Sequence, residues 1–521
     1  MKRLHAPLLA ALLAGLTASA ATAGPALPDR AVPPAAGQSA GAFRSGSPHA
    51  SSDRAVLDGL RHAARPLRTT EPGGNPADLR PLGRMIGDAE VVGFGEATHS
   101  THEFFTVKDR TLRHLVTEKG FRTFALETSW STGLRLDTYV RTGRGDLAQI
   151  LREEFQGSYW AWNTAESAEM YRWIRAWNVR HPHDPVRVMG DDFGHAGPEV
   201  FDRVSDYVER HRPGLAGRIE EIYADLRPTG SAAEFMAEVV RRPLAERRAD
   251  AARAAEAVRL LTERPVTSGR RAGEAYDWAV QHARAVEQTF RIYSFDFEDP
   301  SGDGMRASME YRDATMAANV DWWHRQTGDK MLVSAHNLHL AYVTSEPQNY
   351  PRVQGSFLRE RLGKDYVSIG TTFGRGSFNA VDPGTGKRQV FTLGARPGSN
   401  EEMLNELGGR PFALDLRHTP PAARAWLALP RFTWSIGAAY STTPGGYEEP
   451  DDEIALSRWH DILVHIPEVR AAELLPSAPS VPSAPSAPSA ATAPTAPSAS
   501  SAPSVPAAPS APSATSEDAS G

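Results

Sequence analysis

Short runs of residues that favour β-strands alternate along this chain with segments of helical length and composition. The runs are residues 90–95, 121–126, 186–190, 331–335 and 366–370, and helix-like segments such as residues 103–119 and 165–179 separate several of them. Alternation of this kind is typical of α/β proteins. The sequence therefore predicts a mainly parallel central sheet flanked by helices.

The body of the chain is interrupted by a long segment with a different pattern. Residues 199–295 are charged and alanine-rich, with helical periodicity and no convincing strand, which predicts a helical insertion domain. We expect the two halves of the α/β core at residues 55–198 and 296–475. With 521 residues, of which 40% are hydrophobic, the chain has enough apolar material for a core of this size.

The N-terminal residues have the organisation of a secretory signal peptide. Basic residues at positions 2 and 3 precede an apolar run from Ala6 to about Ala20 and a small-residue pattern at residues 21–23. The run is short for a bilayer span of about 20 residues, although an N-terminal anchor remains the alternative. We therefore expect a signal peptide at residues 1–23, a low-complexity linker at residues 24–54, and a secreted or cell-surface protein with no membrane span in its mature chain.

The C-terminal residues repeat proline, alanine and serine. Residues 476–521 contain almost no large apolar side chains and cannot build a core. We expect a disordered tail, extended and partly in polyproline II conformation, that serves as a tether or spacer with the cell wall as a candidate contact. No role in chemistry is expected for it.

Charge and cysteine content exclude several classes of function. The formal net charge of −6 is spread over the chain without a basic field, so it does not favour a nucleic-acid or anionic-membrane partner, and a small-molecule substrate fits better. The chain has no cysteine, which excludes a disulfide, a thiolate nucleophile and a cysteine-ligated metal site.

Ionisable residues follow several of the predicted strands directly. Glu96 and His99 come after the first strand, Glu127 after the second, and His336 after a later one. Any one of them alone would more often be a helix cap or a loop hydrogen bond. Because ligands of open α/β sheets bind at the carboxyl ends of the strands, their repeated placement predicts one shared site.

This set of residues has the chemistry of a water-activating centre. A carboxylate beside an imidazole orients the ring and stabilises its positive charge, so that the imidazole can take a proton from water. Attack of that water on an acyl carbon creates an oxyanion, which His336 or Lys108 could hold. We therefore predict hydrolysis of an ester, although a lysine on a helix, as Lys108 is expected to be, is most often solvated.

Other residues are candidates for substrate binding. Besides Lys108, these are His339 and two aromatic residues of the cluster at 159–162, Trp160 and Trp162. Aromatic side chains can form a pocket wall, but core packing is their more common role.

Two alternatives stay open at this point. Neutral imidazoles and carboxylates are also ligands for zinc, iron or manganese, and His336 and His339 are three residues apart, which is compatible with a ligand pair. We assign no cofactor, but a metal-dependent hydrolase of another ester or amide would use the same residues. The second alternative is a non-catalytic secreted protein whose strand-end residues only bind a ligand.

Several short motifs occur in distant parts of the chain. They are Gly-Glu-Ala-Thr-His-Ser-Thr-His-Glu-Phe at residues 95–104, Gly-Phe at 120–121, Leu-Glu at 126–127, Trp-Ile-Arg-Ala-Trp-Asn at 173–178, Arg-Asp-Ala-Thr-Met at 312–316 and Ala-His-Asn-Leu-His at 335–339. In these motifs and their order, the chain resembles the erythromycin esterase family from about residue 57 to 467.

This resemblance implies a hydrolase that opens the macrolactone ester of erythromycin-type antibiotics and so gives macrolide resistance, with a cleft between an α/β domain and a helical insertion. It implies that His99 is the general base, that Glu96, Glu127 and His336 surround it, and that catalysis needs no metal. The chain departs from the family pattern at Ser100, where glycine is common, and at Lys108, where resistance esterases can have arginine. The substrate is not fixed by the resemblance, because many homologues have no demonstrated macrolide activity.

Overall fold

The fold is described from a computed structural model over residues 48–265, 269–442 and 453–477. The strands are β1 Arg65–Pro66, β2 Val91–Glu96, β3 Phe121–Ser129, β4 Arg187–Asp192, β5 Lys330–His336, β6 Tyr366–Asp382, β7 Lys387–Gly394, β8 Phe412–Asp415, β9 Arg431–Phe432, β10 Glu453–Ile454 and β11 Ile462–Val469. The helices of the first half are α2 Pro48–Ala63, η1 Pro76–Leu79, α3 Arg80–Ile86, α4 His102–Lys119, α5 Trp130–Thr142, α6 Leu147–Glu154, η2 Gly157–Trp162 and α7 Ala165–Arg180. The remaining helices are α8 Pro198–His211, α9 Pro213–Ala224, α10 Ala232–Val239, α11 Leu244–Thr262, α12 Arg270–Tyr293, α13 Asp303–Thr327, α14 Asn337–Leu340, α15 Gln354–Leu362, η3 Gly363–Asp365, α16 Asn400–Asn405, α17 Pro421–Leu427 and α18 Leu456–Trp459.

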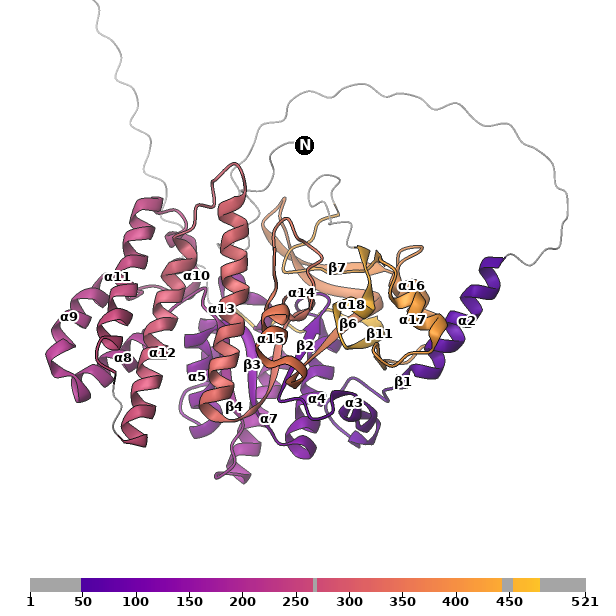
Figure 1. The fold of residues 1–521 in the computed structure, drawn as a ribbon, viewed down its shortest axis with the longest axis horizontal. Helices are drawn as coiled ribbons and strands as arrows, with labels where there is room; N and C mark the ends of the chain where they lie inside the picture. The colour runs from indigo at the N-terminus through magenta and orange to yellow at the C-terminus, as the bar shows by residue number, and fades with distance from the viewer. Residues whose placement is uncertain (1–47, 266–268, 443–452, 478–521) are drawn as a thin grey trace, which may run out of the picture. The chain divides into compact units, whose positions relative to one another are not determined.

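A central sheet of nine strands, counted over the described residues, organises the fold (Figure 1). Its main path runs β1-β8-β11-β6-β2-β5-β3-β4, and β7 pairs with β6. The strands from β11 to β4 are parallel to one another, whereas β8, β1 and β7 join in antiparallel pairs. The predicted α/β fold with a mainly parallel sheet and flanking helices is confirmed.

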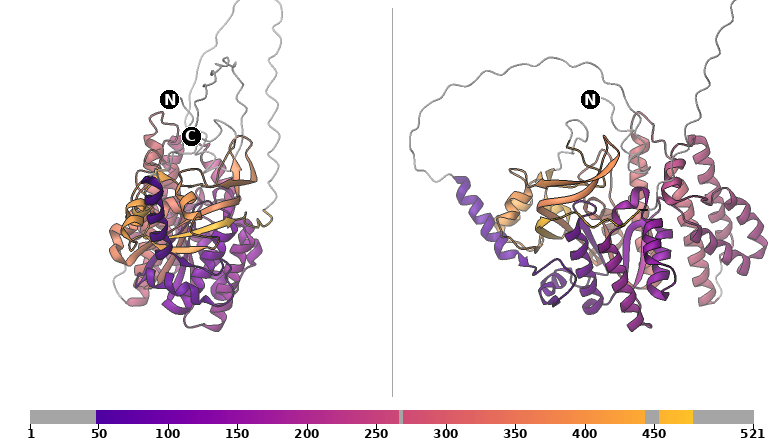
Figure 2. Two further views of the ribbon diagram at one scale, coloured as in Figure 1. Left: turned by 90° about the vertical axis from the view of Figure 1, so that its right-hand side faces the viewer. Right: turned by 180° about the vertical axis from the view of Figure 1, so that it is seen from behind.

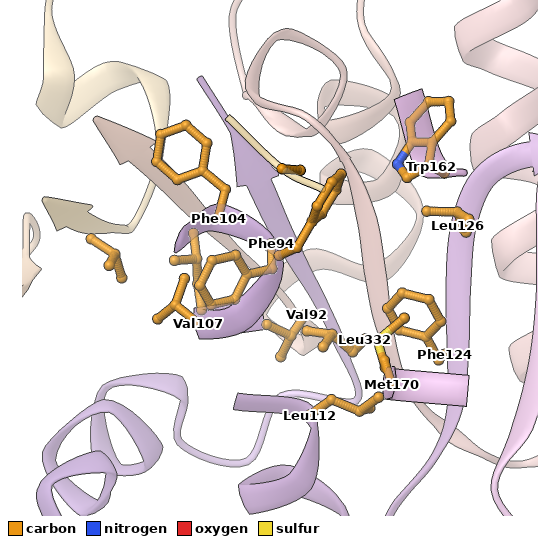
Figure 3. Packing of buried hydrophobic residues seen from close by; sticks show 14 of the residues in the cluster. Val92, Phe94, Phe104, Val107, Leu112, Phe124, Leu126, Trp162, Met170 and Leu332 are labelled. Atoms are coloured by element: carbon orange, nitrogen blue, oxygen red, sulfur yellow. The ribbon is translucent and has the colours of Figure 1, made fainter. Parts of the chain in front are cut away.

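Strand β2 lies inside the sheet and is buried on both faces. Its apolar residues Val92 and Phe94 belong to the same buried cluster as Leu332 of β5 and the α4 residues Phe104 and Val107 (Figure 3). Each fully buried side chain of this kind contributes roughly 1.5–3 kcal/mol of hydrophobic stabilisation. This packing fixes α4 against the sheet, and so fixes the loop that joins β2 to α4.

A glycine allows a close approach at the end of β2. A Cβ atom on Gly95 would lie 2.2 Å from the side-chain oxygen of Asn337, which starts α14 after β5. Asn337 also donates to the backbone oxygen of Thr371 in β6, so it links the turn after β5 to β6, next to the end of β2. The turn after β5 can therefore sit directly against the end of β2.

Helices α8 to α12 lie beside the edge of the sheet formed by β4, as Figures 1 and 2 show. In the described part of the segment predicted as a helical insertion, residues 199–265 and 269–295, no strand occurs. The apolar residues of α8, α11 and α12 form a second buried cluster together with residues of α5 and β4. The domain boundaries at residues 198 and 295 stay predictions.

The predicted signal peptide at residues 1–23 lies outside the described residues, as do all but two residues of the predicted tail and most of the predicted linker. Helix α2 begins at Pro48, earlier than the expected start of the folded body at residue 55, and its Val56 and Leu60 are buried in a cluster with residues of α17. None of the helices in the described ranges combines the length and apolar character that crossing a bilayer requires.

Candidate active site

The carboxyl ends of three neighbouring strands bring the predicted residues together. Strand β5 lies between β2 and β3, so that Glu96, His336 and Glu127 stand on adjacent strands. Glu96 and His336 are direct partners in the β2–β5 register. His99 follows in the loop after β2, and the centroid of its ring lies 5.2 Å from that of His336.

Glu96 and His99 form a buried carboxylate–imidazole pair. Nδ1 of His99 lies 2.7 Å from Oε1 of Glu96. Because a carboxylate can only accept a hydrogen bond, Nδ1 carries the proton and Nε2 is left with its lone pair. Only 7% of His99 is exposed. The pair has the arrangement of a general base with its orienting carboxylate.

Lys108 is not solvated, in contrast to the ordinary expectation for a helical lysine. It is only 2% exposed, and its Nζ lies 2.6 Å from Oε2 of Glu96 and 2.7 Å from Oγ of Ser334. The reason is its place on the face of α4 that packs against the sheet. Burial raises the pKa of Glu96, but Lys108 and the hydrogen bond from His99 outweigh it and lower this pKa below its usual range.

His336 is a neutral imidazole with one free donor. Its Nδ1 accepts a hydrogen bond from the backbone N–H of Leu338 at 3.3 Å, so the proton is on Nε2. That Nε2 is buried and has no hydrogen-bond partner among the residues that the structure describes. Burial, helped by the nearby charges of His99 and His339, lowers the pKa of His336 to about 3. A neutral imidazole that presents an unused N–H is suited to hold a developing oxyanion.

Glu127 has a different environment from that of Glu96. Its Oε2 accepts the backbone N–H of His336 at 2.9 Å, and its Oε1 lies 2.9 Å from Nη2 of Arg312. Burial raises the pKa of Glu127, but the charges of His339 and Arg312 dominate and hold it well below its usual range. Glu127 therefore fixes the end of β5, from which His336 extends.

Three further charged residues, Arg312, Asp192 and Asp313, lie on the same side of the site as Glu127. From the sequence we predicted no role for them. Nη2 of Arg312, on α13, lies 2.6 Å from Oδ2 of Asp192, and Asp313 accepts from Nδ1 of His339 at 2.8 Å. Asp192 ends β4, so the signal that pointed to Glu96 and Glu127 could have found it too. For Arg312 and Asp313, the family motif at residues 312–316 was the available signal.

His339 lies beside Glu127, and its pKa is shifted in the direction opposite to that of His336. Its Nε2 lies 3.4 Å from Oε1 of Glu127, while its Nδ1 faces Asp313. Burial lowers the pKa of His339, but Asp313 and Glu127 outweigh this effect and raise it above the usual value.

The two predicted tryptophans have different surroundings. Trp162 packs edge-on against His99, with ring centroids 5.1 Å apart, whereas the guanidinium of Arg388 lies 5.3 Å above the ring of Trp160. Trp162 is thus a wall of the predicted site. The place given to Trp160 in substrate binding stays a prediction.

The metal alternative concerns the same histidines. Over residues 48–265, 269–442 and 453–477, no group of three or more histidine, aspartate or glutamate side chains has the geometry to hold a metal ion. His336 and His339 have opposite pKa shifts and different partners, so their spacing in the sequence does not translate into a matched pair.

Fold and site together define a class: α/β proteins with an ionisable centre at the carboxyl ends of a parallel sheet. The sequence profile of the family named erythromycin esterase matches residues 116–469. This range contains Glu127 and the turn from His336 to His339, and it begins after Glu96 and His99.

The chain is also similar to individual proteins. Erythromycin esterase type II of Escherichia coli is 25% identical over 346 residues, which are 63% of this chain and 79% of that protein. The solved structure of a protein described as a succinoglycan biosynthesis protein is 30% identical, with a TM-score of 0.71 over 83% of this chain and 100% of its own. A Bacillus cereus protein is 28% identical, with a TM-score of 0.72 over 81% of this chain and 99% of its own.

A mutant erythromycin esterase in its open conformation shares the fold, with a TM-score of 0.61 and 18% identity over 79% of this chain and 99% of its own. The chain belongs to the erythromycin esterase family. This membership implies an ester hydrolase with a small-molecule substrate.

Proposed function

We propose that this protein hydrolyses a carboxylic ester with water that His99 activates. The observation that carries the proposal is the buried Glu96–His99 pair, 2.7 Å apart, next to a neutral His336 whose Nε2–H has no partner within the described ranges. One imidazole is thus ready to accept a proton and the other to donate a hydrogen bond.

The reaction follows from these two states. Nε2 of His99 takes a proton from water as the water oxygen bonds to the acyl carbon, and Glu96 stabilises the resulting imidazolium. The carbonyl oxygen becomes an oxyanion, which the Nε2–H of His336 stabilises. When the tetrahedral intermediate collapses, the bond to the alcohol oxygen breaks, and the imidazolium of His99 returns its proton to that oxygen.

The structure favours His336 over Lys108 for the oxyanion. The ammonium group of Lys108 is already engaged by Glu96 and Ser334 and is almost fully buried. We assign Lys108 the role of stabilising the ionised form of Glu96, which keeps the carboxylate available to His99.

The substrate we propose is a macrolide lactone, which would make the protein a secreted or cell-surface resistance enzyme. Family membership and the relation to an erythromycin esterase support this choice. The relation to a protein described as a succinoglycan biosynthesis protein supports the inclusion of other esters in the assay.

The test is incubation of the mature protein with erythromycin, other macrolides and a panel of simple esters, followed by mass spectrometry. We expect a ring-opened product heavier than erythromycin by one water. Hydrolysis of simple esters without ring opening would reject the macrolide substrate, and no hydrolysis in the whole panel would reject the esterase. Activity that is lost to a chelator and restored by a metal would favour a metal-dependent hydrolase.

A further inference from the structure

Ser100, the residue after the proposed base, has an unusual backbone conformation. Its φ of 56° makes it the single non-glycine residue with a positive φ in the described part of the chain. This left-handed region is unfavourable for residues with a Cβ atom, so surrounding contacts must hold it. Because Ser100 directly follows His99, its backbone angles set the path between the base and α4.

Asn379, a buried residue of β6, holds this conformation. Its Nδ2 donates to Oγ of Ser100 at 3.1 Å and to the backbone oxygen of Ala472 at 2.9 Å. Both Nδ2 and the backbone N–H of Asn379 also lie 3.4 Å from the backbone oxygen of Ser100. Its side chain therefore joins the His99 loop to Ala472, which follows β11.

We call residues 470–475 the C-terminal strap. This segment contacts two loops of the proposed site, the loop after His99 and the loop after Trp162. On the side of His99, the N–H of Ala472 donates to the backbone oxygen of Ser100 at 3.1 Å, and the N–H of His102 donates to the backbone oxygen of Arg470 at 2.8 Å. On the side of Trp162, the N–H of Ala165 donates to the backbone oxygen of Glu473 at 2.9 Å.

The strap also reaches the loop that carries Trp162. The N–H of Leu475 donates to the backbone oxygen of Asn163, the residue after Trp162, at 2.9 Å. Since Trp162 packs edge-on against His99, the strap ties the base and its aromatic neighbour to one segment.

We propose that Asn379 and the C-terminal strap are positioning elements: by holding Ser100 in its left-handed conformation, they place His99 for catalysis. The proposal rests on the proposed role of His99 as the base. It explains how a serine can occupy position 100, where glycine is common in the family, and why the chain after β11 runs past the His99 loop.

The test compares substitutions at residues 100 and 379 in the full-length protein. Glycine adopts a positive φ without penalty, whereas a β-branched residue resists it. We expect S100V to lower kcat at least about 10-fold more than S100G, with KM little changed, because small displacements of a base are costly. N379L should lower kcat similarly, and the double variant S100G/N379L should recover most of that loss, since glycine no longer needs to be held.

A matched control is available on the same strand. Oγ of Ser377 accepts the N–H of Ala471 in the strap at 3.0 Å, and S377A removes a strap contact that is not directed at Ser100. We expect S377A to change kcat by less than about 2-fold, because Ser377 is only half-buried and its hydrogen bond does not reach Ser100. Equal kcat in S100V and S100G, or no rescue of N379L by S100G, would overturn the proposal.

A second measurement separates this proposal from the esterase itself. Amide hydrogen exchange of residues 97–103 and 470–475 should accelerate in N379L, and less so in S100G/N379L and S377A. If the wild-type protein hydrolyses no ester, the proposed function fails, but the exchange experiment still decides whether Asn379 holds the loop. Unchanged exchange in N379L would overturn that role.

Discussion

The two sides of the site contain the same kinds of group, but these groups are paired in different ways. On the His99 side, Glu96 has one cation, Lys108, and the His99 ring keeps a free Nε2. On the Arg312 side, Glu127 shares Arg312 with a second carboxylate, Asp192.

This difference indicates that the two sides have different roles. A ring nitrogen with a free lone pair can take part in proton transfer, whereas an arginine shared by two carboxylates holds its surroundings in place. We infer that the His99 side performs the chemistry and that the Arg312 side fixes the end of β5, from which His336 extends.

The largest effect is expected on the His99 side. H99A should lower kcat by about 1000-fold, since loss of a general base usually costs 10²- to 10⁴-fold. The measurement is steady-state hydrolysis of the best ester in the panel, with the Tm as a control for folding. A variant that is folded and keeps kcat within about 10-fold of the wild type would exclude His99 as the base.

Glu96 and Lys108 allow activity to be separated from stability. E96Q leaves Lys108 buried without its carboxylate, so we expect a loss of about 3–5 kcal/mol in the free energy of unfolding and a fall in kcat of about 100-fold. The double variant E96Q/K108M removes both charges and should recover most of the stability without recovering kcat.

Denaturant titration and steady-state kinetics on the same protein samples check this prediction. Recovery of kcat together with stability would mean that Glu96 acts only by supporting the fold.

A smaller effect is expected on the Arg312 side. In E127Q, Arg312 keeps Asp192 as a partner at 2.6 Å, so no buried cation is left alone. We expect kcat to fall by about 10-fold, through misplacement of the end of β5, with a smaller loss of stability than in E96Q. If E127Q were the more damaging of the two variants, the division between the two sides would be reversed.

The last prediction concerns the pH dependence of stability and not kcat. Folded His336 has a pKa of about 3, whereas the unfolded residue binds a proton below about 6.5. His336 therefore makes the free energy of unfolding fall as the pH is lowered from about 6.5 toward 3, by up to about 1.4 kcal/mol per pH unit. His339 has a raised pKa, so its contribution is fully present below about 6.5 and is lost as the pH rises through its folded value.

Denaturant unfolding across this pH range, in H336Q and H339Q, checks the two opposite signs. H336Q should flatten the decline on the acid side, and H339Q should flatten the decline on the alkaline side. The same sign in both variants would show that the two histidines share one environment.

Much of the fold and half of the site's charged network could be predicted from the sequence. Runs of β-favouring residues identified β2 to β6, and observed strand ends such as Glu96 and His336 lie within a few residues of the predicted ends. Because polar residues after buried strands in a parallel sheet converge, the same runs also pointed to Glu127.

The rest depends on tertiary packing, which leaves no local signal. Arg312 and Asp313 lie in the interior of α13 and reach the site through the packing of that helix. The burial of Lys108 depends on which face of α4 meets the sheet. Likewise, the hold on Ser100 comes from Asn379, 279 residues further along the chain.

The central claim is that His99 and His336 act on the same ester from two sides, and a crystal structure with a bound phosphonate analogue of a hydrolysed ester tests it most directly. One phosphonate oxygen should lie about 3 Å from Nε2 of His336, and the oxygen in the position of the attacking water about 3 Å from Nε2 of His99. An analogue bound away from both rings, or held by the metal of a metal-loaded protein, would contradict it.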